Sequence, residues 1–379
     1  MKDEQSSSSK TMSSYPFSKF FSQLMPAEDQ PLVSVITPVY NGEEFLAECI
    51  ESILAQTYQN WDYTIVNNRS TDRTLEIARS YAAQDPRIRI HDNAEFLPII
   101  PNHNHAISQI SPKSKYCKVV LADDWLFPEC LMKMVALAEV HPSVGLVGAC
   151  GLHGDGLYVM WRGLPFPRIV VSGREASRLQ LLKGIYIFGA PTATLIRSDF
   201  IRKQKKFYDE SNIHADSTAC FRVLQESDFG FVHQLLTFTR IREGSNTSFS
   251  ERMNSVQLSF LTELMQYGPS CLEQTEYNDR FRVRLQEYYQ VLAEGLLQMR
   301  GSSYLEFHKD WLRRLGIPLS WSKLFLGCLR AIWKGLSHPS AAVKSLARWW
   351  FRDSVRAKAA ARKKAGEVAL SLHHREGKK

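Results

Sequence analysis

Apolar runs and amphipathic stretches alternate along the first 150 residues of the chain. Short runs rich in Val, Ile and Tyr have the length and β-branched content of buried strands; they lie at residues 31–40, 61–68, 87–92, 116–124 and 144–150. Amphipathic stretches typical of helices separate them, at residues 41–57, 70–84, 102–111 and 128–140. This alternation predicts an α/β fold, with a doubly wound, mainly parallel sheet covered by helices on its faces.

Capping signals precede the first two of these helices. Asn41 stands before the first helical stretch, and Glu44 follows at the spacing of a capping box. Ser70 or Thr71 is placed to cap the second helix. We therefore expect these side chains to bind the first backbone N–H groups of their own helices.

The pattern changes after residue 151 and becomes almost entirely helical from about residue 250. Residues 173–184 and 216–227 look helical, and residues 192–198 and 231–242 look like strands. The first segment of the chain is polar and Ser-rich, which is typical of disorder. We expect four parts, namely a disordered leader (1–30), an α/β domain (31–249), a helical C-terminal region (250–342) and a basic tail (343–379).

The positive charge of the chain is concentrated in its tail. The whole sequence has 47 Lys and Arg against 39 Asp and Glu, and residues 343–379 hold 11 and 3 of these, so the remainder has 36 of each. A neutral body argues against a nucleic-acid-binding protein. Residues 324–352 mix Trp, Phe and Leu with Lys and Arg, which predicts contact with a membrane surface; helices packed on the domain, followed by a solvated tail, are the alternative.

Other segments exclude several classes of protein. No apolar run of about 18 residues and no secretory signal is present, so we expect a cytoplasmic protein without a spanning helix, at most peripheral at the inner face of the membrane. The seven cysteines are scattered, without a CxxC pair. This spacing predicts neither a zinc site nor a disulfide framework.

Polar residues follow three of the predicted strands, at Pro38–Asn41, Asn67–Asp72 and Asp123–Asp124. In a doubly wound sheet, ligands bind beyond the carboxyl ends of the strands. Asp123 and Asp124 are adjacent carboxylates after an apolar run, and like charges are costly to bury without a partner. Their arrangement indicates a hard cation such as Mg²⁺ or Mn²⁺; the alternative is one solvated carboxylate and one helix cap.

Three motifs together resemble the family 2 glycosyltransferases. They are "VSVITPVYNGEEFLAECIESILAQTYQNWDYTIVNNRSTDRT" at residues 33–74, "ADD" at 122–124 and "IHADSTACFRVL" at 213–224. The resemblance covers about residues 31–245. It implies a GT-A fold and transfer of a sugar from a nucleotide-diphosphate donor to an acceptor hydroxyl with inversion, in polysaccharide or glycoconjugate synthesis.

The resemblance also implies roles for individual residues. Asp216 matches the catalytic acidic residue and is expected to be the general base, with His214 as the less favoured choice. Asp123 and Asp124 are expected to hold Mg²⁺ or Mn²⁺. The donor, expected to be a UDP-sugar, would bind to Pro38, Tyr40, Asn41, Asn67, Asn68, Arg69, Asn104 and Asp123. The acceptor would be a glycan, a lipid-linked molecule or a protein.

Two positions depart from the pattern of this family. Asn67 stands where the family has an Asp that contacts the nucleotide base, and Leu121 replaces the first Asp of the D-x-D motif. They sustain an alternative function, a catalytically lapsed protein that binds glycans or serves as a scaffold. Arg240 and Arg242 follow the last predicted strand, where they could pair with a diphosphate or lie at the surface as ordinary arginines.

Overall fold

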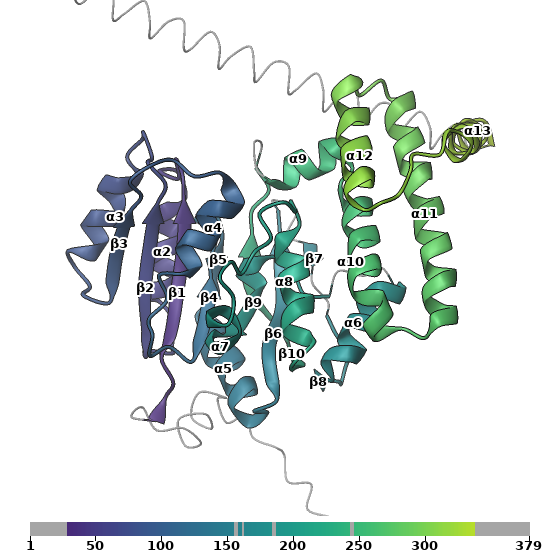
Figure 1. The fold of residues 1–379 in the computed structure, drawn as a ribbon. Helices are drawn as coiled ribbons and strands as arrows, with labels where there is room; N and C mark the ends of the chain where they lie inside the picture. The colour runs from purple at the N-terminus through teal and green to yellow at the C-terminus, as the bar shows by residue number, and fades with distance from the viewer. Residues whose placement is uncertain (1–28, 155–157, 161–162, 184–186, 243–245, 338–379) are drawn as a thin grey trace, which may run out of the picture. The chain divides into compact units, whose positions relative to one another are not determined.

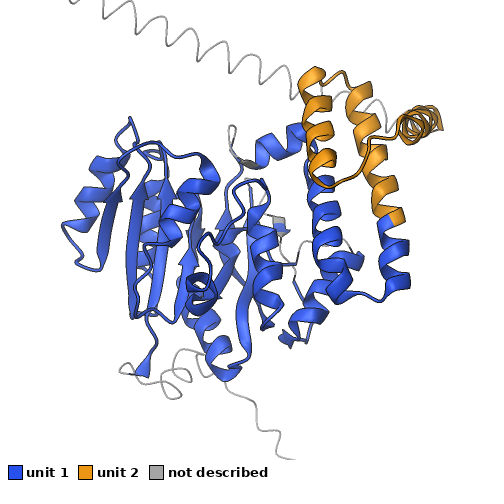
Figure 2. Cartoon of the chain, viewed as in Figure 1, with its two compact units in different colours: residues 1–281 blue, residues 282–379 orange. Residues whose placement is uncertain are grey.

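The computed structural model describes residues 29–154, 158–160, 163–183, 187–242 and 246–337. The predicted basic tail lies outside these residues, as does the predicted leader except for its last two positions. The chain divides into two compact units, residues 1–281 and 282–379, which Figure 2 shows in different colours.

A ten-stranded sheet forms the centre of the first unit (Figure 1). Its main path runs β3-β2-β1-β4-β9-β6-β10-β5. The strands are β1 (Val33–Val39), β2 (Trp61–Asn67), β3 (Ile88–Asp92), β4 (Tyr116–Val119), β5 (Trp125–Leu126), β6 (Val144–His153), β7 (Tyr158–Met160), β8 (Val170–Val171), β9 (Thr194–Arg197) and β10 (Asp228–Thr239).

Strands β1 to β4 are parallel, as are β6 and β10. Strand β9 is inserted antiparallel between β4 and β6. The predicted mainly parallel, α/β class is confirmed. The parallel order places the carboxyl ends of β1, β2 and β4 at one edge of the sheet.

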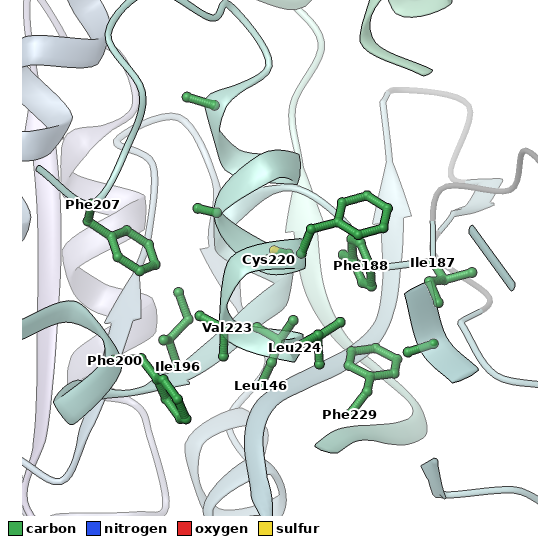
Figure 3. Packing of buried hydrophobic residues seen from close by; sticks show 14 of the residues in the cluster. Leu146, Ile187, Phe188, Ile196, Phe200, Phe207, Cys220, Val223, Leu224 and Phe229 are labelled. Carbon is green, nitrogen blue, oxygen red and sulfur yellow. The ribbon is translucent and has the colours of Figure 1, made fainter. Parts of the chain in front are cut away.

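Helices cover both faces of this sheet, since the alternate side chains of one strand enter two different cores. Val35 packs into a core with helices α2, α3 and α5, whereas Ile36 packs into one with α4, α6, α8 and α10. Figure 3 shows part of the second core, where Phe188, Phe229 and Leu146 pack near α8. The helices are α2 (Leu46–Leu54), α3 (Thr74–Ala82), α4 (Ile99–Ile107), α5 (Cys130–Val140), α6 (Gly173–Lys183), α7 (Ser198–Arg202), α8 (Ala215–Leu224), α9 (Asn246–Met253) and α10 (Val256–Cys271).

The second unit consists of helices. Helix α11 (Gln274–Leu297) passes from the first unit into the second, and α12 (Ser302–Arg314) and α13 (Trp321–Ser337) follow. Tyr304 of α12 packs so close to Gly295 of α11 that a Cβ at residue 295 would lie 2.3 Å from its hydroxyl. None of the helices within the described ranges has both the length and the apolarity needed to cross a bilayer.

The predicted helix caps are wrong. Helix α2 begins at Leu46 and α3 at Thr74, and neither has a capping side chain at its N-cap residue. The Asn41 side chain instead accepts a hydrogen bond from the backbone N–H of Thr71, 2.8 Å away. Asn41 therefore binds a backbone N–H thirty residues away in sequence and not the first N–H groups of α2.

Candidate active site

The loops that follow β1 and β2 are joined to each other by hydrogen bonds. The backbone N–H of Asn41 donates to Oγ of Ser70 (3.0 Å), and the N–H of Gly42 donates to Oγ1 of Thr74 (2.8 Å). Asn41 has a left-handed backbone (φ 49°), a conformation that Asn tolerates well. The two strand ends therefore form one connected polar edge, as the sequence predicted for parallel neighbours. Pro38, at the end of β1, is buried and lies beside Val66.

Two exposed aromatic rings lie together at this edge. Tyr40, after β1, is 44% exposed, and Phe96, after β3, is 56% exposed. Their ring centroids are 4.9 Å apart in an edge-to-face arrangement. The pair offers an apolar surface to a planar ring such as a nucleotide base. Sequence reasoning did not identify Phe96, because nothing in the segment Asn93–Pro98 marks it as a neighbour of Tyr40.

Asn67 is buried at the end of β2, with only 1% of its surface exposed. Its amide nitrogen donates to Oδ1 of Asp92 at 2.7 Å, and its amide oxygen accepts from the N–H of Ser70 at 3.3 Å. Asp92, at the end of β3, is exposed. Asn67 and the carboxylate of Asp92, one strand further along the sheet, thus form a hydrogen-bonded pair at this polar edge. Sequence reasoning missed Asp92, although its place at a strand end was a usable signal.

Asn68 holds the loop that carries Phe96. Its side chain accepts from the N–H of Leu97 and donates to the carbonyl of Leu97, at 2.9 and 2.7 Å. Arg69 follows in a left-handed conformation (φ 59°) with an exposed side chain. Asn68 therefore shapes the site from inside the fold, whereas the guanidinium of Arg69 is open to an anionic ligand.

Asp124 is buried, 2% exposed, and both of its carboxylate oxygens are bound. Oδ2 accepts from the hydroxyl of Thr192 (2.5 Å) and Oδ1 accepts from the backbone N–H of Arg240 (3.0 Å). Burial, followed by the nearby charge of Asp123, raises the pKa of Asp124 to about 8. The alternative in which a carboxylate of this pair caps the next helix is wrong, because α5 begins at Cys130 without a side-chain cap.

Asp123 is the more accessible carboxylate of the pair, with 16% of its side chain exposed. It forms an ion pair with Arg242. Arg240, by contrast, is fully engaged, since it binds the Asp123 carbonyl and the carboxylate of Glu48. The side chain of Leu121 packs against the apolar core and supplies no oxygen ligand.

The acidic pair fits a magnesium-type site with one protein carboxylate. Among the described residues, no three His, Cys, Asp or Glu side chains group as a metal cluster. Mg²⁺ is commonly bound by one or two carboxylates together with substrate phosphates and water, which a single accessible carboxylate such as Asp123 can satisfy. A metal role for Asp124 stays a prediction, and it requires Asp124 to exchange Thr192 or Arg240 for the ion.

Helix α4 holds the loop before α8. The Asn104 side chain accepts from the N–H of Tyr208 (2.7 Å) and donates to its carbonyl (2.8 Å). The ring centroid of His103, one residue earlier, lies 6.1 Å from that of Tyr208. Burial lowers the pKa of His103 to about 4, against the attraction of Asp123. Asn104 thus positions a loop, and His103, whose ring lies near Tyr208 of that loop, is close enough to Asp123 for its charge to act on the imidazole.

Asp216 lies in the first turn of α8 and is half-buried. It lines a cavity of about 10 Å³, the size of one water molecule, together with Tyr208, Phe207 and Pro191. His214 is turned to another partner, since its Nε2 lies 2.9 Å from Oγ of Ser255. Burial lowers the pKa of His214, although the charge of Asp216 opposes this.

A buried carboxylate lies behind Asp216, which sequence reasoning also missed. Glu263 of α10 is 1% exposed and accepts hydrogen bonds from Ser217 (2.7 Å) and Ser259 (2.8 Å). Burial raises the pKa of Glu263 to about 7, and the charge of Asp216 adds to the rise. Helix α10 therefore contacts the residue next to the predicted base.

Comparison with known proteins gives one consistent result. Residues 34–205 match the family model described as Glycosyl transferase family 2. Glycosyltransferase GlyG of Streptococcus pneumoniae serotype 4 is 38% identical over 227 residues, which are 56% of this chain and 72% of GlyG. EpsE of Bacillus subtilis (strain 168), named as a glycosyltransferase, is 36% identical over 169 residues, which are 41% of this chain and 60% of EpsE.

Some relatives are matched over a smaller share of their length, for example 42% of a glycosyltransferase from Haemophilus influenzae. Among solved structures, residues 1–349 of S. aureus TarS in complex with UDP-GlcNAc align with a TM-score of 0.52 at 18% identity. This alignment covers 68% of this chain and 72% of that one. It supports the GT-A-like fold.

Proposed function

Because the chain belongs to glycosyl transferase family 2, we propose that it transfers a sugar from a nucleotide-diphosphate donor to an acceptor hydroxyl with inversion. The observation that carries the proposal is the meeting of three strand-end segments at one edge of the sheet. The loops after β1 and β2 are hydrogen-bonded to each other, and β4, which leads into Asp123, pairs with β1. The family assignment and this geometry support the same reaction independently.

The donor of this reaction is a UDP-sugar. Tyr40 and Phe96 provide the exposed aromatic surface for the base, and the carboxylate of Asp92 lies beside Asn67 at the same edge. A carboxylate accepts hydrogen bonds and so suits the ring N–H of uracil. Asp92 would then do for the base what an Asp at position 67 does elsewhere in the family. The exposed guanidinium of Arg69 is suited to the anionic part of the donor.

Asp123 would hold the divalent ion, Mg²⁺ or Mn²⁺, with the donor diphosphate. When bound, such an ion neutralises the charge that develops on the departing nucleoside diphosphate. Arg242, which forms an ion pair with Asp123 in the structure, would then be placed to contribute a second positive charge. Asp124 supports this arrangement by fixing the backbone at Arg240 and the side chain of Thr192.

Asp216 would be the general base. The acceptor oxygen forms a bond to the anomeric carbon while the bond from that carbon to the diphosphate oxygen breaks, and the hydroxyl proton passes to the carboxylate of Asp216. Attack from the face opposite the leaving group inverts the configuration. The position of Asp216 in the first turn of α8, beside the Tyr208 loop that Asn104 holds, supports this role. His214 is the weaker choice, because its ring nitrogen is bound to Ser255.

A panel of UDP-, GDP- and dTDP-sugars, each with and without Mn²⁺, tests the proposal. We expect UDP-sugars to raise the melting temperature and to be hydrolysed slowly to UDP, with Mn²⁺ enhancing both effects. Nucleotide release from none of the donors, with thermal shifts still present, would favour the catalytically lapsed binding or scaffold protein. Two observations favour this second function. Leu121 supplies no oxygen ligand, and both carboxylate oxygens of Asp124 already accept hydrogen bonds.

We propose further that the enzyme builds a polysaccharide or glycoconjugate in the cytoplasm, at the inner face of the membrane. The acceptor would be a glycan, a lipid-linked molecule or a protein. The apolar and basic composition of the C-terminal sequence supports a peripheral membrane contact there. Identification of the acceptor requires transfer assays with the donor that the panel selects.

A further inference from the structure

Helix α13 exposes a continuous apolar face. Its exposed apolar side chains include Phe325 (64% exposed), Trp333 (73%) and Leu336 (72%). At 100° per residue the exposed apolar positions fall within one face of the helix; they are Trp321, Phe325, Leu326, Leu329, Ile332, Trp333 and Leu336. A soluble helix normally buries such a face, so this one requires a partner.

The opposite face of α13 is already packed within the second unit. A Cβ at Gly327 would lie 2.8 Å from the carbonyl oxygen of Tyr289 and 3.0 Å from Cβ of Ala293, both on α11. Leu324, one turn earlier, is only 5% exposed. The close approach at Gly327 fixes the rotation of α13 about its axis. The helix therefore cannot bury its exposed apolar face by rotating about that axis.

The charges of α13 are all positive. Lys323, Arg330 and Lys334 are its charged residues, and they lie together beside the apolar face. Lys334 lies 4.0 Å from a carboxylate oxygen of Glu294, and Arg330 is exposed. The sequence that follows, residues 338–379, adds 11 Lys and Arg against 3 Asp and Glu.

We propose that α13 binds an anionic lipid surface, lying in the interface with its apolar face in the acyl boundary and its basic residues among the headgroups. Charge complementarity selects this partner, because a second copy of the chain would bring the same cations against each other. Lys323, Arg330 and Lys334 are spread along the described part of the helix, Trp321–Ser337, an arrangement typical of a helix that lies along the interface. This deepens the proposed location of the enzyme and does not depend on its chemistry.

Sedimentation of the full chain with vesicles tests the proposal without any donor sugar. Vesicles of phosphatidylcholine with phosphatidylglycerol should bind the protein, and vesicles of phosphatidylcholine alone should bind it much more weakly. The double variant Phe325→Gln/Trp333→Gln should lose roughly tenfold or more in binding, because two large apolar side chains no longer enter the interface. Circular dichroism would establish that this variant keeps its helices.

Two matched controls show whether vesicle binding depends on the apolar face of α13 or on other features of the chain. The variant Val140→Gln/Met299→Gln changes two apolar residues outside α13, which are 63% and 88% exposed, and it should leave vesicle binding unchanged. Arg362→Gln/Lys363→Gln/Lys364→Gln removes three charges from the tail sequence and should weaken binding by electrostatics only, so that it persists at low salt.

Three results would overturn the proposal. The first is equal binding of the Phe325→Gln/Trp333→Gln variant and the unmodified chain, and the second is complete loss of binding in the tail variant. The third is self-association without lipid, abolished by the face variant and accompanied by no vesicle binding, which would assign the face to a second copy. Sugar transfer in solution is compatible with each of these results, so failure here leaves the proposed function standing.

Discussion

In the Asn67–Asp92 pair, the amide nitrogen of Asn67 makes the contact attractive, whereas an oxygen in its place would make it repulsive. The amide nitrogen of Asn67 lies 2.7 Å from a carboxylate oxygen of Asp92. An Asp at position 67 would face that carboxylate without a proton to share. The amide therefore fits this chain because Asp92 is present, and the departure at position 67 does not by itself indicate lost activity.

We expect Asn67→Asp to destabilise the fold by about 1–3 kcal/mol at neutral pH, since the buried hydrogen bond becomes a like-charge contact. Repulsion raises the pKa of one carboxyl in the folded variant, so the penalty applies above the unfolded pKa and is relieved as the pH falls towards about 4. Urea denaturation of both proteins at several pH values measures it.

The swapped variant Asn67→Asp/Asp92→Asn is the matched control. It restores one amide and one carboxylate, and it should recover most of the stability. If Asp92 accepts a hydrogen bond from the ring N–H of uracil, Asp92→Asn alone should weaken UDP binding about tenfold, while CDP affinity should change little because cytosine has no ring N–H. Calorimetry on the two nucleotides would contradict this base-reading role if both lost affinity equally.

The adjacent carboxylates Asp123 and Asp124 should respond differently to the same substitution. Asp123→Asn removes the accessible carboxylate, and we expect the dependence on Mn²⁺ to be lost together with transfer, while the melting temperature stays within a few degrees. Asp124→Asn should lower stability by about 1–3 kcal/mol, because one of its two buried acceptor positions becomes an N–H₂ group facing a donor.

Calorimetric melting and Mn²⁺ titration of both variants check this contrast. Unchanged Mn²⁺ dependence in Asp123→Asn would show that the ion is held elsewhere. A stable Asp124→Asn variant without Mn²⁺ response would transfer the metal role to Asp124.

At the scale of elements, the first turn of helix α8 carries the predicted base, Asp216, and contacts the buried carboxyl of Glu263. Asp216 and Ser217 are consecutive, and Ser217 donates to Glu263 of α10. We expect Asp216→Asn to lower kcat by roughly 10²–10⁴ and to leave donor affinity nearly unchanged. Steady-state kinetics with UDP binding in parallel measure both quantities. Loss of donor affinity together with kcat would instead place Asp216 on the donor side of the site.

Glu263 should make stability depend on pH. The pKa of its carboxyl is about 7 in the fold and about 4.5 unfolded, so between these values the folded state holds a proton that the unfolded state has released. Stability should therefore fall as pH rises from about 4.5 to 7, by a few kcal/mol, of the order of 3. Glu263→Gln should make this slope less steep in urea titrations, while Asp124, whose pKa is also raised, continues to contribute to it. An equal slope in the variant would assign the pH dependence to other groups.

The periodicity of apolar residues predicted the helices and strands well. The predictions that failed concern side chains whose hydrogen-bond partners are distant in sequence. Strands β1, β2 and β3 occur where apolar spacing placed them, and helices α10 to α13 lie in the region predicted to be helical from about residue 250, because burial of a repeated face decides the element. The caps failed because Asn41 is bound to Thr71, and the state of Asp124 was unpredictable because Thr192 lies 68 residues away. The strand at residues 194–197 was expected, but its antiparallel insertion between β4 and β6 depends on the whole sheet.

For the whole molecule, the division into two compact units separates the two proposed activities. Every predicted donor, metal and base residue lies in residues 1–281, and the exposed face of α13 lies in residues 282–379. Each unit has its own buried side chains, for example Leu146 in the first and Leu292 in the second, both 0% exposed. A unit with its own core can unfold in its own transition.

We therefore expect calorimetry to resolve two transitions, of which UDP with Mn²⁺ raises only the one that belongs to the first unit. Leu292→Ala should destabilise the second unit by about 2–5 kcal/mol and leave UDP affinity unchanged, whereas Leu146→Ala should lower the transition that responds to UDP. A single transition that both variants and the ligand shift alike would mean that the continuous helix α11 couples the units into one cooperative structure. In that case, occupation of the donor site would also stabilise the helix that we propose to bind lipid.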